Sequence, residues 1–291
     1  MASNDKFYTK KEIAQKCIEF TKKYYKLNDE IVLEPSAGNG SFLDFLKNFE
    51  AYDLLPEDDR IIQKDFFTFE SNKKDYIAIG NPPFGKRSKM AIDFFNKVAR
   101  YSKAICFIVP VSFMKWSVQK QLDDNFKLID YFYLPLNSFL DREKEFSIRT
   151  IFQIWTKKEE NSLPDIRLKN SPPISHKDFN IWQYNATPEA LKVIDNNWKI
   201  ATYRQGYHDY NQKFYPKDKD YIYNCMRGIG VKGKQQFFFI EPLSFESEII
   251  INSMDFNALA ERNTTTPGFG KGDFVSYYLE LKKNLDREEE I

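Results

Sequence analysis

The sequence predicts an α/β protein, with a parallel sheet covered by helices and a smaller α+β domain after it. Over the first 156 residues, apolar runs typical of strands alternate with segments of helical periodicity. Some runs, such as residues 104–110, are almost continuously apolar, as expected of strands buried on both faces. The charged segment 157–165, which contains Pro164, is typical of a linker to a second domain.

Three helices are expected in the first domain. Residues 10–24 place Ile13, Cys17 and Phe20 at helical spacing. Residues 41–49 follow a glycine turn and show a similar apolar face. A third helix is predicted at about residues 90–101, between two strand-like runs.

The expected strands are short runs rich in β-branched and aromatic residues. They lie at residues 30–36, 49–54, 75–80, 104–110, 127–135 and 150–155. The domains are therefore expected to span residues 1–160 and 161–291. The second contains apolar runs and a glycine-rich loop at residues 228–234, which predicts a small mixed α+β fold.

Charge argues against a protein that coats nucleic acid without selectivity. Residues 1–160 contain 26 basic and 24 acidic residues, and residues 161–291 contain 17 and 18. The formal net charge is +1. A nucleic-acid partner would therefore need a local basic patch.

Cysteine usage and hydropathy exclude two further classes. Cys17, Cys106 and Cys225 are far apart, and with two histidines they form no metal-ligand spacing, so no metal is expected. The N-terminal residues are polar, and the sequence has no run of about 18 apolar residues. We expect a protein with free thiols in the cytoplasm or another intracellular compartment, with no membrane partner.

The first candidate site is the turn from Ser36 to Gly40, which follows a strand ending in Glu34. Its two glycines allow a ligand to approach the backbone closely. The turn lacks the third glycine of the dinucleotide fingerprint and the Lys-Ser/Thr pair of a phosphate loop. Glu34 and Asp53, at the ends of neighbouring strands, suit a ligand with hydroxyls and an amine. A tight turn without a ligand remains the alternative.

The second candidate site is Asn81-Pro82-Pro83-Phe84, directly after the strand at 75–80. Together with Glu34, Gly38 and Gly40, it resembles the S-adenosylmethionine-dependent adenine-N6 nucleic-acid methyltransferases whose cofactor motif comes first. The resemblance covers residues 7–156. It implies a Rossmann-like class I methyltransferase domain with a seven-stranded, mostly parallel sheet, followed by a target-recognition domain.

The resemblance also implies roles for individual residues. S-adenosylmethionine would be held by the N-terminal motif, the glycine turn and two acidic positions: Tyr8, Thr9, Glu34, Ser36, Ala37, Gly38, Gly40, Asp53, Asp65 and Phe66. Asn81, Pro82 and Phe84 would be catalytic. A base in a duplex would have to be flipped out to reach them.

The chemistry of an aromatic amine explains the second motif. Its nitrogen is a poor nucleophile because its lone pair is delocalised into the ring. The Asn81 side-chain carbonyl and the Pro82 backbone carbonyl can accept hydrogen bonds from the NH2 and stabilise the charge that develops on it. The prolines hold these carbonyls rigid, and the ring of Phe84 offers a stacking face for the base.

Three residues are candidates for contact with the substrate. Lys86 and Arg87 follow the catalytic turn and could meet a phosphate backbone, or simply begin a solvated helix. Phe146, expected in a loop, could be a second stacking face or a core residue. The substrate is expected to be DNA, with RNA as the alternative. Glutamine side chains in a protein are a more distant alternative, because those related enzymes usually have Tyr at the position of Phe84.

Overall fold

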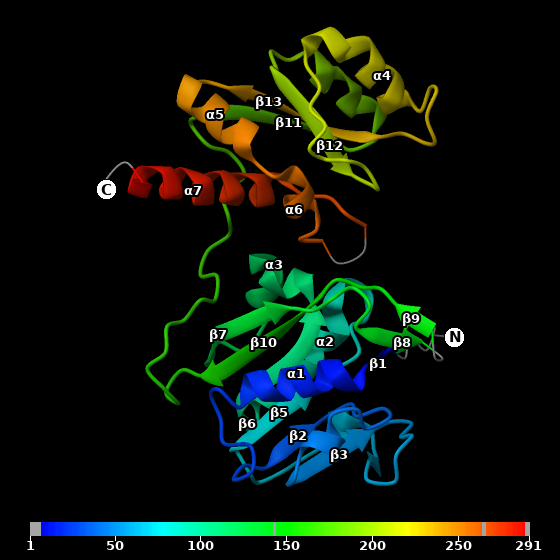
Figure 1. The fold of residues 1–291 in the computed structure, drawn as a ribbon, viewed down its shortest axis with the longest axis vertical. Helices are drawn as coiled ribbons and strands as arrows, with labels where there is room; N and C mark the ends of the chain where they lie inside the picture. The colour runs from blue at the N-terminus through cyan, green and yellow to red at the C-terminus, as the bar shows by residue number, and fades with distance from the viewer. Residues whose placement is uncertain (1–6, 142–143, 264–265, 289–291) are drawn as a thin grey trace. The chain divides into compact units, whose positions relative to one another are not determined.

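The structure, a computed structural model, describes residues 7–141, 144–263 and 266–288. The chain divides into two compact units, residues 1–170 and residues 171–291. Within the first unit, seven strands form one sheet in the order β4-β3-β2-β5-β6-β10-β7 (Figure 1). Their bounds are Ile62–Gln63, Phe49–Asp53, Val32–Glu34, Tyr76–Gly80, Ser102–Pro110, Thr150–Lys157 and Phe126–Tyr133, respectively.

Six of these strands run in one direction. The pairs from β4 to β6 are all parallel, whereas β10 is antiparallel to both of its neighbours, β6 and β7. This is a Rossmann-like α/β fold, and it confirms the predicted seven-stranded, mostly parallel sheet. All six predicted strands lie in this sheet.

Both faces of the sheet are buried, which explains the continuous apolar runs. On β5, Ile77 and Ile79 pack in one cluster with residues of α1 (Lys11–Thr21). Ala78, which points the other way, packs in a second cluster with residues of α2 (Lys89–Ala99). Both helices confirm the sequence prediction. A short helix, α3 (Trp116–Gln119), follows β6.

The helix predicted over residues 41–49 is wrong. Only one 3-10 turn forms, at Leu43–Phe45, and Leu46 already has extended backbone angles. The apolar residues at helical spacing nevertheless pack in one cluster, together with residues of α1: Phe42, Phe45, Leu46 and Phe49. The chain then enters β3 at Phe49, which pairs with Val32. Too few residues remain between the glycine turn and this strand for a helix.

A small second sheet joins distant parts of the first unit. It consists of β1 (Tyr8–Thr9), β8 (Phe139–Asp141) and β9 (Lys144–Phe146), with β8 in the centre. All its pairs are antiparallel. None of these three strands was predicted, and Phe146, expected in a loop, ends β9. The N-terminal motif is thereby fastened to the hairpin that carries Phe146.

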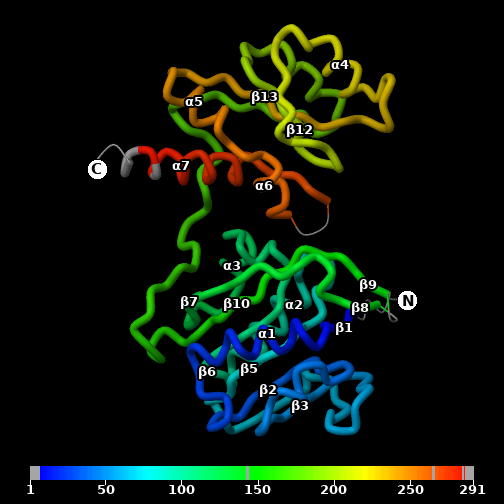
Figure 2. The backbone as a smooth tube through the Cα atoms, in the orientation of Figure 1, coloured from blue at the N-terminus to red at the C-terminus, as the bar shows by residue number. Residues whose placement is uncertain are grey.

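The second unit has a three-stranded antiparallel sheet between two helical layers (Figure 2). The strands are β11 (Phe179–Tyr184), β13 (Gln236–Pro242) and β12 (Ile200–Gln205), in that order. The helices are α4 (Lys219–Arg227), α5 (Phe245–Ser253), α6 (Phe256–Ala260) and α7 (Lys271–Glu288). This is the smaller α+β fold that the sequence predicts.

The structural boundary lies ten residues beyond the expected one. Residues 161–170 belong to the first unit, because Arg167 anchors them there. Its guanidinium donates to the backbone carbonyls of Gln119, Leu122, Asp123 and Phe126 at 2.6–3.1 Å. Such a network fixes the segment more firmly than its charged composition indicates.

Candidate active site

The candidate residues gather at one edge of the large sheet. Strands β2, β3 and β5 are parallel, so their carboxyl ends lie at the same edge. Glu34 ends β2, Asp53 ends β3 and Asn81 follows β5. In open α/β sheets, ligands bind outside this edge. The fold therefore brings together the two motifs that lie more than 40 residues apart in the sequence.

The glycine turn is built from two glycines in left-handed conformations and packs against the N-terminal motif. Gly38 and Gly40 have φ angles of +56° and +74°, which residues other than glycine rarely adopt. The Gly38 N–H donates to Asp53 Oδ2 at 2.8 Å. A Cβ atom on Gly38 would lie 3.2 Å from the ring of Tyr8, so the N-terminal motif packs directly on the turn. Ala37 is buried beside it.

Glu34 is a buried acid without a sufficient partner. The residue is only 2% exposed, and its Oε2 has no hydrogen-bond donor among the described residues. Burial, and then the nearby charge of Asp53, raise the pKa of Glu34 well above its usual value. An unpaired buried carboxyl group is costly, and a ligand amine or hydroxyl would satisfy it.

The Asn81 amide is held in one orientation. Its Nδ2 donates to the backbone carbonyl of Phe7 at 3.2 Å, while its Oδ1 is buried without a partner among the described residues. The Ser36 hydroxyl donates to the Asn81 backbone carbonyl at 3.4 Å and links the two motifs. Asn81 Oδ1 is thus a buried acceptor held in one position.

Thr9 adds a third unsatisfied atom at this site. Seven buried side-chain nitrogen or oxygen atoms of the described residues have no partner, and Thr9 Oγ1, Glu34 Oε2 and Asn81 Oδ1 are three of them. Buried polar atoms in folded proteins are nearly always hydrogen-bonded. Three exceptions among the predicted site residues therefore indicate positions that a ligand would fill.

The turn after Asn81 is rigid and strained. Pro82 is buried and Phe84 is half-buried, with its ring edge-on to Phe139 at 6.5 Å. Arg87 and Ser88 both adopt left-handed backbone conformations, with φ of 54° and 62°. Such conformations cost about 1–3 kcal/mol each and are concentrated at functional sites. Lys86 and Arg87 are exposed beside the turn.

Phe146 lies against Phe7, the first residue of the N-terminal motif. Its ring stacks on that of Phe7 at 4.0 Å with an interplanar angle of 11°. One face of Phe146 is therefore covered. Phe7 is thus central to the site twice, through this ring and through the carbonyl that binds Asn81. The local sequence around Phe7 gives no signal for either contact.

The remaining predicted cofactor residues differ in what they offer. Asp53 accepts backbone N–H groups on both oxygens, from Gly38 and from Leu55. Asp65 is exposed and caps the 3-10 turn at Phe66–Thr68. The ring of Phe66 is buried and stacks on Phe69 at 5.0 Å. Its backbone, rather than its ring, is the part available to a ligand.

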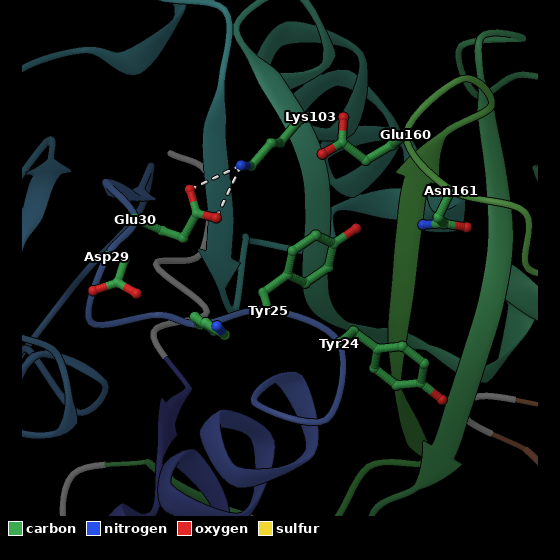
Figure 3. Close-up of a pocket in the computed structure, with 8 residues that line it drawn as sticks. Tyr24, Tyr25, Asp29, Glu30, Lys103, Glu160 and Asn161 are labelled. Carbon is green, nitrogen blue, oxygen red and sulfur yellow. Dashed lines mark hydrogen bonds and ion pairs between the residues drawn. The ribbon is translucent and has the colours of Figure 1, made fainter.

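A pocket at the opposite edge of the sheet has different chemistry (Figure 3). It is lined by residues that precede β2 and follow β10, among them Glu30 and Glu160. Lys103 forms an ion pair with Glu30 at 2.8 Å, and Tyr25 donates to Thr156 at 2.9 Å. The charges of Lys103 and Glu30 thus compensate each other. No residue of either motif lines this pocket.

Neither a metal site nor a membrane-spanning helix is found within residues 7–141, 144–263 and 266–288. No group of three or more His, Cys, Asp or Glu side chains in these ranges could hold a metal ion. The same ranges contain no helix long and apolar enough to cross a membrane.

Comparison with known proteins gives only distant structural matches. No family model and no curated protein matches the sequence. Among solved structures, the modification subunit of a candidate type I restriction enzyme from Vibrio vulnificus YJ016 has 16% identity and a TM-score of 0.43, over 54% of this chain and 46% of its own. A candidate RNA methyltransferase from Pyrococcus horikoshii has 18% identity and a TM-score of 0.43, over 53% and 87%.

The EcoKI M protein of a type I restriction enzyme has 17% identity and a TM-score of 0.42, over 57% of this chain and 47% of its own. This chain therefore spans less than half the length of both restriction-enzyme subunits. TM-scores below 0.5 do not by themselves establish a relationship, so the function has to be inferred from the site.

Proposed function

We propose that the first unit binds S-adenosylmethionine and transfers its methyl group to the N6 amine of adenine in DNA. The observation that carries the proposal is Asn81 Oδ1, a buried acceptor without a partner among the described residues, whose orientation is set by the Phe7 carbonyl. An acceptor fixed beside a glycine cradle is what activation of an aromatic amine needs.

The residues of the cradle fit the cofactor. Glu34 Oε2 and Thr9 Oγ1 are buried atoms that lack partners among the described residues and could bind the polar groups of the methionine part. Gly38 and Gly40 keep the backbone accessible, and Asp53 lies beside them for the ribose hydroxyls. When bound, S-adenosylmethionine would supply an electrophilic methyl group, so the protein needs neither a metal nor a covalent intermediate.

The chain's own groups would act on the amine. Asn81 Oδ1 and the Pro82 carbonyl accept hydrogen bonds from the two N–H groups of the amine. These bonds localise the nitrogen lone pair and stabilise the developing positive charge. Because the Asn81 amide and the prolines are already fixed, little reorganisation is needed during the reaction. Phe84 supports the plane of the base. The strained residues 87–88 hold the end of the turn in place.

DNA is proposed as the substrate because the order of the motifs, cofactor site first and Asn-Pro-Pro-Phe second, resembles adenine-N6 methyltransferases. The test uses three parallel reactions, each with the protein, methyl-labelled S-adenosylmethionine and one substrate: DNA, RNA or a whole-cell protein extract. We expect label on DNA adenine N6 and none with Asn81→Ala. Label on RNA or on protein glutamine instead would assign another substrate, and no label on any of them would contradict the proposal.

A further inference from the structure

Charge is distributed unevenly along the sequence of the second unit. Residues 213–234, which contain α4 and its flanking loops, include six basic and two acidic residues. The rest of residues 171–291 includes nine basic and 15 acidic residues. A near-neutral total therefore conceals a basic segment of 22 residues in an acidic unit.

The two layers lie on opposite faces of the small sheet. Tyr184 donates from its hydroxyl to the Met226 carbonyl at 2.7 Å, which holds α4 on the face of Tyr184 and its strand partner Phe237. Phe238, which points the other way, stacks on Phe269 at 5.1 Å, on the side of α6 and α7. Figure 1 shows α4 and α7 on different sides of the sheet. The α4 helix therefore lies on the face opposite α7.

The carboxyl end of α4 and the glycine loop form a compact surface. Tyr223, Arg227, Lys232 and Lys234 are exposed. Arg227 lies over the Tyr223 ring at 5.6 Å. A Cβ atom on Gly228 would lie 3.3 Å from Gly233, so the loop folds back and brings its two lysines toward the end of the helix. We call these four side chains the α4 patch.

The cations of the α4 patch are not neutralised by the protein. No carboxylate of the described residues forms an ion pair with Arg227, Lys232 or Lys234, whereas Lys219 on the same helix pairs with Asp195 at 3.0 Å. The patch also includes an aromatic ring that is 38% exposed. Cations beside an exposed ring are the features that bind phosphates and bases.

We propose that the α4 patch is the nucleic-acid-binding surface of the second unit, contacting the phosphate backbone of the DNA that the first unit methylates. This rests on the proposed function. Lys232 and Lys234 each bind a phosphate, and Tyr223 packs against a sugar or an unstacked base. The layer of α5, α6 and α7, on the other face of the sheet, points away from the DNA.

The test measures how DNA affinity depends on salt. A labelled 30-base-pair DNA duplex is titrated with the full chain over a series of salt concentrations, using fluorescence anisotropy. Each lost phosphate contact lowers the slope of log K against log salt by about 0.9. Lys232→Gln/Lys234→Gln should therefore reduce the slope by about 2.

A matched control removes the same charge elsewhere. Lys177 precedes β11 and Lys283 lies on α7, and both are exposed. Lys177→Gln/Lys283→Gln should keep the wild-type slope. Tyr223→Ala should weaken binding about tenfold without changing the slope, and Tyr223→Phe should bind like wild type. Equal slopes for the patch and control variants would overturn the assignment.

The outcomes separate this inference from the methylation proposal. If the wild type methylates DNA but the patch variant keeps the wild-type slope, the surface is wrong and the function stands. If the slope depends on the patch but no methyl group reaches DNA, the surface stands and the function is wrong. A slope that changes for an RNA duplex and not for DNA would overturn DNA as the partner.

Discussion

The two units present polar groups in opposite ways. At the edge of the large sheet, Thr9, Glu34 and Asn81 have buried atoms without partners among the described residues. In the second unit, Arg227, Lys232 and Lys234 are exposed. Buried acceptors are rigid and little screened, which suits chemistry, whereas exposed cations are screened by salt and suit adjustable binding. The rate of methyl transfer and the affinity for DNA should therefore respond to different mutations.

Asn81→Ala should have the largest effect. We expect methyl transfer to fall by at least about 100-fold, because a preorganised acceptor at a developing charge is lost. S-adenosylmethionine affinity should stay near that of wild type, since the loss falls on the transition state. Single-turnover transfer and calorimetric titration measure the two quantities.

The control for Asn81 is Asn96, whose amide also donates to a backbone carbonyl, that of Gln121 at 2.9 Å, but on α2. Asn96→Ala should transfer methyl groups within a few-fold of wild type. Equal rates for Asn81→Ala and wild type would exclude amine activation by Asn81.

Glu34→Gln should change stability and affinity in opposite directions. Because the folded-state pKa of Glu34 is raised, its contribution to stability is complete below the unfolded pKa of about 4.3 and is lost as pH rises through the folded pKa. The amide cannot ionise, so the ligand-free variant should melt higher than wild type at pH 8, with a smaller difference at pH 4.

Affinity for S-adenosylmethionine should nevertheless fall about tenfold in Glu34→Gln, because the ligand amine loses a charged partner. Thermal unfolding with and without cofactor at both pH values measures this. A variant that melts lower than wild type at pH 8 and binds cofactor equally well would show that Glu34 has only a structural role.

Substitution of Phe84 should have a smaller effect, which falls on DNA binding. If its ring stacks on adenine, Phe84→Leu should lose about 1–3 kcal/mol of DNA binding, while Phe84→Tyr should retain most of it. A duplex with 2-aminopurine at the target adenine reports extrusion through its fluorescence. If the Leu variant matched wild type in affinity and in fluorescence change, Phe84 would only line the site and would not stack on the base.

Six of the seven strands of the large sheet were predictable, because both faces of the sheet are buried and these strands produce apolar runs; β4 has two exposed residues and gave no such run. The N-terminal motif and its neighbours were harder. β1, β8 and β9 contain two or three residues each, too few for a periodic signal. The role of Phe7 depends on a carbonyl and a ring contact across more than 70 residues, which no local pattern encodes.

The helix at 41–49 failed for a related reason. Its apolar residues do pack in one cluster, but the chain enters β3 at Phe49 and leaves room for only one 3-10 turn. Composition also concealed the charge asymmetry of the second unit. The roles assigned to the individual site residues remain predictions.

The central claim is that the buried edge of the first unit controls rate and the α4 patch controls affinity. The most direct measurement is the single-turnover rate of methyl transfer at saturating DNA, for Asn81→Ala and for Lys232→Gln/Lys234→Gln. We predict a loss of at least about 100-fold for the first variant and a rate within a few-fold of wild type for the second. Equal losses in both variants, or a normal rate in Asn81→Ala, would contradict the claim.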